Sequence, residues 1–65
     1  MRYMAMEALQ CIKNNNFVFD YCIEKRTTNK KLNELIIQWF FEDGSSLLIK
    51  YKGDKLVRSD IRIAD

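Results

Sequence analysis

Residues 34–63 read ELIIQWFFEDGSSLLIKYKGDKLVRSDIRI, and this stretch decides the fold. Apolar and polar side chains alternate through it with a period of two, which is typical of β-strands that are buried on one face. Two turn signals divide the stretch, Asp43-Gly44 and Gly53-Asp54, because Asp-Gly and Gly-Asp pairs favour tight hairpin turns. The stretch therefore predicts three strands, over about 34–41, 46–52 and 55–63, joined by short connections.

The residues before this stretch predict a helix and one more strand. Apolar residues recur three and four positions apart from Arg2 to about Lys13, which predicts an amphipathic helix over about 2–14 that ends at the asparagines 14–16. From Phe17 the period changes to two, which predicts a strand over about 17–25, followed by a polar and basic loop. We expect one domain, 1–65, of the α+β class: an N-terminal helix packed on one face of a four-stranded antiparallel β-meander.

Alternation divides the strand side chains between two faces. The face expected under the helix holds Phe17, Phe19, Tyr21, Ile23, Leu35, Ile37, Trp39, Phe41, Leu47, Ile49, Tyr51, Val57, Ile61 and Ile63. The opposite face is mixed, with apolar residues near its middle (Ile36, Phe40 and Leu48) and basic residues on one side (Lys50, Lys52, Arg58 and Arg62). An apolar patch with a charged rim often marks a contact surface for a second copy or for another protein. Scattered apolar residues on a solvated sheet face are the ordinary alternative.

Length and composition narrow the class of protein. Chains of 65 residues bury only about 60% of the surface that they expose when unfolded, so many depend on a disulfide, a metal or a partner chain. The apolar fraction of 48% indicates a chain that folds, and the apolar run 35–41 is far too short for a membrane helix. The net charge of +2 is small for a protein that coats DNA.

Histidine, which many catalytic and metal sites use, is missing from the chain. Neither a Ser-His-Asp nor a Cys-His arrangement can therefore form, and Cys11 and Cys22 are too few and too far apart for a zinc site. No apolar run of signal-peptide length follows Arg2, so we expect two reduced thiols in a cytoplasmic protein, with a disulfide as the alternative. Asp20 and Glu24 share a predicted face, but such carboxylates are usually solvated ion-pair partners. We therefore expect no enzymatic activity, no metal and no cofactor.

Two functions fit these observations. The first is a small non-enzymatic regulator or inhibitor that binds another protein, a second copy of itself as a homodimer, or both, through the mixed face. Its partner-binding residues are then Ile36, Phe40, Leu48, Lys50, Lys52, Arg58 and Arg62. The many Phe, Tyr, Ile, Asn and Lys residues are typical of an AT-rich gene, as in low-GC bacteria and phages, which favours a phage or another mobile element as the source. The alternative is a single-stranded nucleic-acid-binding module, in which the basic residues contact phosphates and Phe40 stacks on a base.

Overall fold

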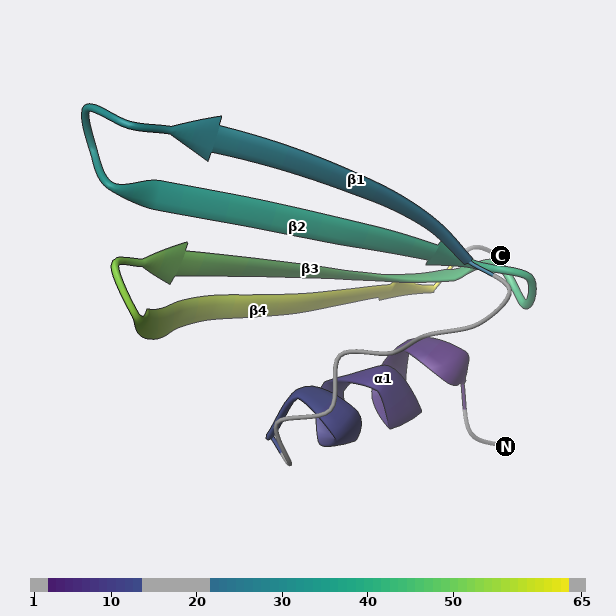
Figure 1. Ribbon diagram of the computed structural model, residues 1–65. Coiled ribbons are helices and arrows are strands. Elements are labelled where there is room, and N and C mark those ends of the chain that lie inside the picture. Colours follow the sequence, from purple (N-terminus) through teal and green to yellow (C-terminus); the bar gives the residue numbers. More distant parts are fainter. Residues whose placement is uncertain (1–2, 14–21, 64–65) are drawn as a thin grey trace.

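The computed structural model describes residues 3–13 and 22–63, and it shows one helix beside one antiparallel sheet (Figure 1). Helix α1 spans Met4–Lys13, and the strands are β1 (Cys22–Asn29), β2 (Glu34–Phe41), β3 (Ser45–Lys52) and β4 (Lys55–Ile63). The strands pair in the order β1-β2-β3-β4, each antiparallel to the next. The predicted α+β meander is confirmed, and so are the bounds of β2 and β4. The predicted end of the helix at residues 14–16 and the strand residues 17–21 lie outside the described residues.

The two predicted turns are present, and glycine makes both of them. Gly44, between β2 and β3, has φ +86°, and its N–H donates to the Phe41 carbonyl at 3.2 Å. Gly53, between β3 and β4, has φ +62°, and its N–H donates to the Asn33 carbonyl of the β1–β2 connection at 2.9 Å. Positive φ suits glycine because it has no Cβ. The β3–β4 turn contains only Gly53 and Asp54, as predicted.

The core lies between α1 and the three strands that it contacts. The helix packs mainly on β3, with β2 and β4 beside it, and it does not extend over β1. Its buried residues are Ala5, Ala8 and Ile12, spaced three and four apart, and the two alanines allow its backbone to approach the sheet closely. They meet the buried sheet residues Ile37, Trp39, Phe41, Leu47 and Ile49. The predicted helix-covered face is therefore correct for β2 and β3.

The first turn of α1 is capped by side chains from the β2–β3 turn. The Asp43 carboxylate accepts from the Met4 N–H at 2.7 Å, and the buried Ser45 hydroxyl accepts from the Ala5 N–H at 3.1 Å. Asp43 also accepts from the backbone N–H and the hydroxyl of Ser45. The hydrogen bond from Met4, followed by those from Ser45, lowers the pKa of Asp43. These contacts satisfy N–H groups that have no partner within a helix, and they tie α1 to one end of the sheet.

Strand β1 differs from the prediction in both its position and its faces. It spans Cys22–Asn29, so most of the expected loop after Glu24 is strand. Cys22 lies opposite Phe41 and Glu24 opposite Trp39, which places both on the helix side, whereas Ile23 lies on the other side and is 71% exposed. The prediction that Ile23 is a core residue is therefore wrong. The helix does not extend over β1, so burial against the helix does not determine which face of β1 is apolar.

Strand β4 carries an irregularity that alternation could not predict. The register shifts beside Lys50 and Tyr51, so that Leu56 pairs with Tyr51 and Arg58 with Lys50, leaving Val57 as the extra residue. Leu56 consequently packs against the core, and Val57 is 48% exposed instead of buried. Ile61 lies on the helix side as predicted, whereas Ile63, at the end of the strand, is largely exposed although it shares that side.

Candidate functional site

The side of the sheet opposite α1, here called the outer face, carries the predicted site. Residues directly opposite one another in antiparallel strands share a face, so the register identifies its members. They are Ile23, Lys25, Thr27 and Asn29 of β1, Glu34, Ile36, Gln38 and Phe40 of β2, Ser46, Leu48, Lys50 and Lys52 of β3, and Lys55, Arg58, Asp60 and Arg62 of β4. The helix lies on the other side (Figure 1), so no described element covers the outer face.

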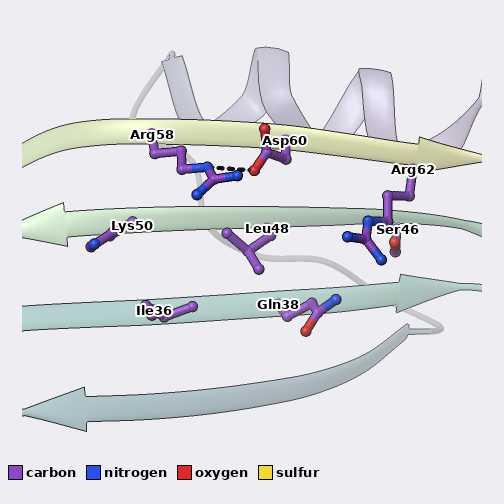
Figure 2. A pocket seen from close by; sticks show the side chains of 8 residues that line it. All are labelled: Ile36, Gln38, Ser46, Leu48, Lys50, Arg58, Asp60 and Arg62. Carbon is purple, nitrogen blue, oxygen red and sulfur yellow. Dashed lines mark hydrogen bonds and ion pairs between the residues drawn. The ribbon is translucent and has the colours of Figure 1, made fainter.

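A shallow depression of about 360 Å³ lies at the centre of the outer face (Figure 2). Five of the seven predicted site residues line it: Ile36, Leu48, Lys50, Arg58 and Arg62. Its remaining lining residues are Gln38, Ser46 and Asp60. Ile36 and Leu48 are half-buried and provide apolar surface near its middle, with the charged side chains of β4 along one side. The depression therefore combines apolar surface with basic groups, as alternation predicted.

The cations around the depression differ in their partners. Lys50 Nζ lies 2.6 Å from a Glu34 carboxylate oxygen, and Arg58 Nε lies 2.6 Å from a carboxylate oxygen of Asp60. Among the described residues, no carboxylate lies within ion-pair distance of Arg62. Exposed ion pairs contribute little to stability, but they do decrease the attraction that each cation exerts on a further anion. Within the described part of the chain, Arg62 is consequently the cation of the depression that has no carboxylate partner.

Phe40 and Lys52 belong to the outer face but not to the depression. Phe40 is 41% exposed and lies opposite Ile23 of β1. These two residues help to line a second hollow, of about 420 Å³, at the end of the β1–β2 pair, together with Cys22, Phe41 and Glu42. Lys52 lies opposite Glu34 and Lys55, near the β3–β4 turn. The register places Phe40 in one row across the sheet with Ser46 and Arg62. Phe40 thus lies at the Arg62 end of the outer face and away from the row that holds Lys50 and Arg58.

Sequence reasoning missed three residues that line the depression, and it missed Ile23, which lies beside Phe40. Gln38 alternates with Ile36 and Phe40, and Asp60 alternates with Arg58 and Arg62, so the sequence pattern places both on the correct face. Their polar side chains gave no reason to include them in the site. Ser46 continues the alternation of Leu48 and Lys50 by one step, so the same signal could have found it. Ile23 was assigned to the core, and only the pairing of β1 with β2 shows that it extends the apolar surface beside Phe40.

The described residues contain no constellation with evident chemistry beyond binding. In residues 3–13 and 22–63, no three Asp, Glu or Cys side chains come together as metal ligands would. Glu24, on the helix side, accepts a hydrogen bond from Trp39 Nε1 at 2.9 Å and pairs with Arg26 at 3.1 Å. These two contacts, the first foremost, lower the pKa of Glu24, which keeps it ionised as an acceptor for the buried indole.

The fold and the site define a small α+β protein with an uncovered, mixed apolar and basic sheet face. Comparison of the chain with protein-family models, with curated proteins and with solved structures finds no match. The only helix in the described part of the chain is ten residues long, and it is not long and apolar enough to cross a membrane. Function therefore has to be inferred from the outer face itself.

Proposed function

We propose that this protein is a small non-enzymatic binding module that docks on a larger protein through its outer face and thereby regulates or inhibits it. The observation that carries the proposal is the apolar surface of Ile36 and Leu48, extended by Phe40 and Ile23, which no described element covers. Apolar surface surrounded by polar and charged groups is typical of protein contact sites. A module of this kind acts by occupying its partner's surface and needs no catalytic group.

The charge of the outer face favours an acidic partner. Among residues 22–63, this face carries six basic residues and two carboxylates, Glu34 and Asp60. The whole chain has a formal net charge of +2, so the remainder of the molecule is net negative. Complementary charge steers partners together, and like charges oppose association.

Self-association through this face is less well supported for the same reason. Counting the described residues alone, two outer faces packed together would bring twelve basic residues against four carboxylates, which charge repulsion opposes. A homodimer stays a prediction from the sequence, and light scattering at low and high salt tests it. We expect a monomer at low salt, because repulsion between like faces is then least screened.

Nucleic-acid binding, the alternative function, is supported by the basic residues and by a single exposed ring. Phe40 is the one aromatic residue among the described members of the outer face, and it lies outside the depression. Single-strand platforms combine a basic groove with aromatic rings on which successive bases stack. A fluorescent oligo(dT) strand tests this function: affinity that falls steeply with salt and is lost in a Lys50→Glu and Arg58→Glu double variant would support it.

The proposed docking is tested with outer-face variants and a matched control. Phe40→Asp and Leu48→Asp place a charge on the apolar surface, whereas Thr28→Asp places one on an exposed position on the helix side of β1. Each protein is used to capture partners from cells that encode it, and the affinity of each candidate is then measured with purified components. We expect at least tenfold weaker binding for both outer-face variants and unchanged binding for Thr28→Asp.

Circular dichroism melting verifies that each variant is folded before its binding is compared. Because Phe40 is already 41% exposed, Phe40→Asp should keep the fold even if Leu48→Asp does not. A folded Phe40→Asp protein that binds its partner as tightly as the wild type would contradict the proposal.

A further inference from the structure

Arg62 combines with two neighbouring polar side chains at one end of the depression. It lies directly opposite Ser46 of β3, and Gln38 lies on the next strand, β2. Figure 2 shows the Arg62 side chain extending from β4 over the Ser46 position, on the same side of the sheet as Gln38. A guanidinium group, a hydroxyl and a carboxamide can all donate hydrogen bonds, so the three side chains form a group of donors beside the apolar surface.

This donor group is the part of the depression best able to accept a new anion. Lys50 and Arg58 already contact Glu34 and Asp60, whereas Arg62 has no such partner among the described residues. The planar guanidinium fork of arginine matches the two oxygens of a carboxylate. An approaching carboxylate would therefore bind at Arg62 without displacing an existing ion pair.

The neighbouring surface indicates what must accompany the anion. Leu48 is two residues from Ser46 along β3, and Ile36 is two residues from Gln38 along β2, so both lie next to the donor group. Their half-exposed side chains favour an apolar group rather than a sugar. Asp60 lies between Arg58 and Arg62 on the same face, and its charge repels a doubly charged phosphate more than a carboxylate.

We propose that Arg62, with Ser46 and Gln38, binds the carboxylate of an Asp or Glu side chain of the partner protein, while an adjacent apolar side chain of that partner packs on Leu48 and Ile36. This inference rests on the proposed docking function and specifies the chemistry of the contact. Arg62 then recognises the negative charge of the partner, and the apolar surface contributes contact area.

The probe for this subsite is 4-methylpentanoate, which joins one carboxylate to a leucine-like tail. Its binding is followed by two-dimensional NMR of the wild-type protein at low salt, with 4-methylpentanamide and acetate as matched compounds that lack the charge or the tail. We expect saturable shifts at the Arg62 guanidinium and at the Leu48 and Ile36 methyl groups. We expect affinity at least fivefold higher than for either matched compound. A probe that shifts none of these signals, or shifts them no more than acetate does, overturns the inference.

Three variants test the role of Arg62. Arg62→Gln should weaken binding of the probe at least fivefold, and Arg26→Gln, an exposed arginine on the helix side of β1, is the matched control that should leave it unchanged. Asp60→Asn should strengthen binding about twofold, since it removes a repelling carboxylate and releases Arg58. A gain in affinity cannot result from misfolding, so an unchanged or weaker Asp60→Asn protein would count against the subsite.

Failure of this inference can be separated from failure of the proposed function. If Phe40→Asp abolishes capture of the partner but Arg62→Gln affects neither the partner nor the probe, the outer face docks a protein without this carboxylate contact. If an oligo(dT) strand binds at Arg62 and 4-methylpentanoate does not, the anion is a phosphate, and both proposals are wrong.

Discussion

At the scale of single residues, two neighbouring serines show how position decides the role of a side chain. Ser45 faces the helix, is 1% exposed, and hydrogen-bonds both the Ala5 N–H and the Asp43 carboxylate. Ser46, the next residue, faces outward into the depression. The same side chain therefore stabilises the fold at one position and is available for binding at the other.

Replacing these serines separately should show the difference. Ser45→Ala leaves the buried Ala5 N–H without its acceptor, so we expect the free energy of unfolding to fall by about 1–3 kcal/mol. Ser46→Ala should change it by less than about 0.5 kcal/mol, as is usual for substitutions on a protein surface. Urea denaturation followed by Trp39 fluorescence measures both. Equal effects of the two substitutions would show that the hydrogen bond from the Ala5 N–H to Ser45 contributes no measurable stability.

At the scale of elements, the bulge in β4 decides which of two adjacent apolar residues belongs to the core. Without it, strict alternation from Ile61 would turn Val57 toward the helix side and Leu56 away from it. The inserted residue reverses this arrangement, so that Leu56 packs beside Tyr51. Counted instead from Lys55, which pairs with Lys52 beside the turn, strict alternation would turn Arg58 toward the helix side. The bulge places Arg58 opposite Lys50 on the outer face, so it contributes to the arrangement of the depression.

Threonine substitutions at positions 56 and 57 should show which of the two residues belongs to the core. Threonine keeps β-propensity but removes apolar surface. Leu56→Thr should lower the free energy of unfolding by about 1–2 kcal/mol, less than a fully buried leucine would cost, because Leu56 is only partly buried. Val57→Thr should lower it by less than about 0.5 kcal/mol. Denaturant unfolding of the two variants makes the comparison, and a larger effect at Val57 would contradict the register described here.

At the scale of the whole molecule, two ionised carboxylates hold separate parts of the structure together. Asp43 joins the β2–β3 turn to the start of α1, and Glu24 joins β1 to the buried indole of Trp39. The pKa of each is lowered by the hydrogen bonds that it accepts in the folded protein. A group whose pKa is lower in the folded than in the unfolded chain stabilises the fold above its unfolded pKa, and this contribution is lost as the pH falls through the folded pKa.

The stability of the protein should consequently decrease on acidification. The decrease should begin as the pH falls below the ordinary pKa values of the two groups, 4.5 for Glu24 and 3.8 for Asp43. Asp43→Asn should be less stable than the wild type at pH 7 and should lose less stability in acid, so that the two proteins converge at low pH. Asp54→Asn, in the other glycine turn, is the matched control. Thermal unfolding at several pH values measures this pH dependence of stability. Parallel curves for the wild type and Asp43→Asn would refute the stabilising role of the Asp43 carboxylate.

The sequence by itself determined the fold class, the order of the strands, both glycine turns and the helix-covered faces of β2 and β3. These features follow from local signals: the period of the apolar residues, and glycine at positions that need positive φ. The same alternation placed Ile36, Leu48, Lys50, Arg58 and Arg62 together on one face, where all five line the depression.

Only the tertiary structure decided the features that depend on pairing and on the reach of the helix. The register between β1 and β2 turns Ile23 outward and Glu24 toward Trp39, and the β4 bulge exchanges Leu56 and Val57. Ion pairs between side chains distinguish Arg62 from Lys50 and Arg58, although in the sequence all three are simply basic. The physical reason is that local periodicity indicates only how side chains alternate along a strand. Pairing between strands that are distant in the sequence determines which residues each side chain contacts.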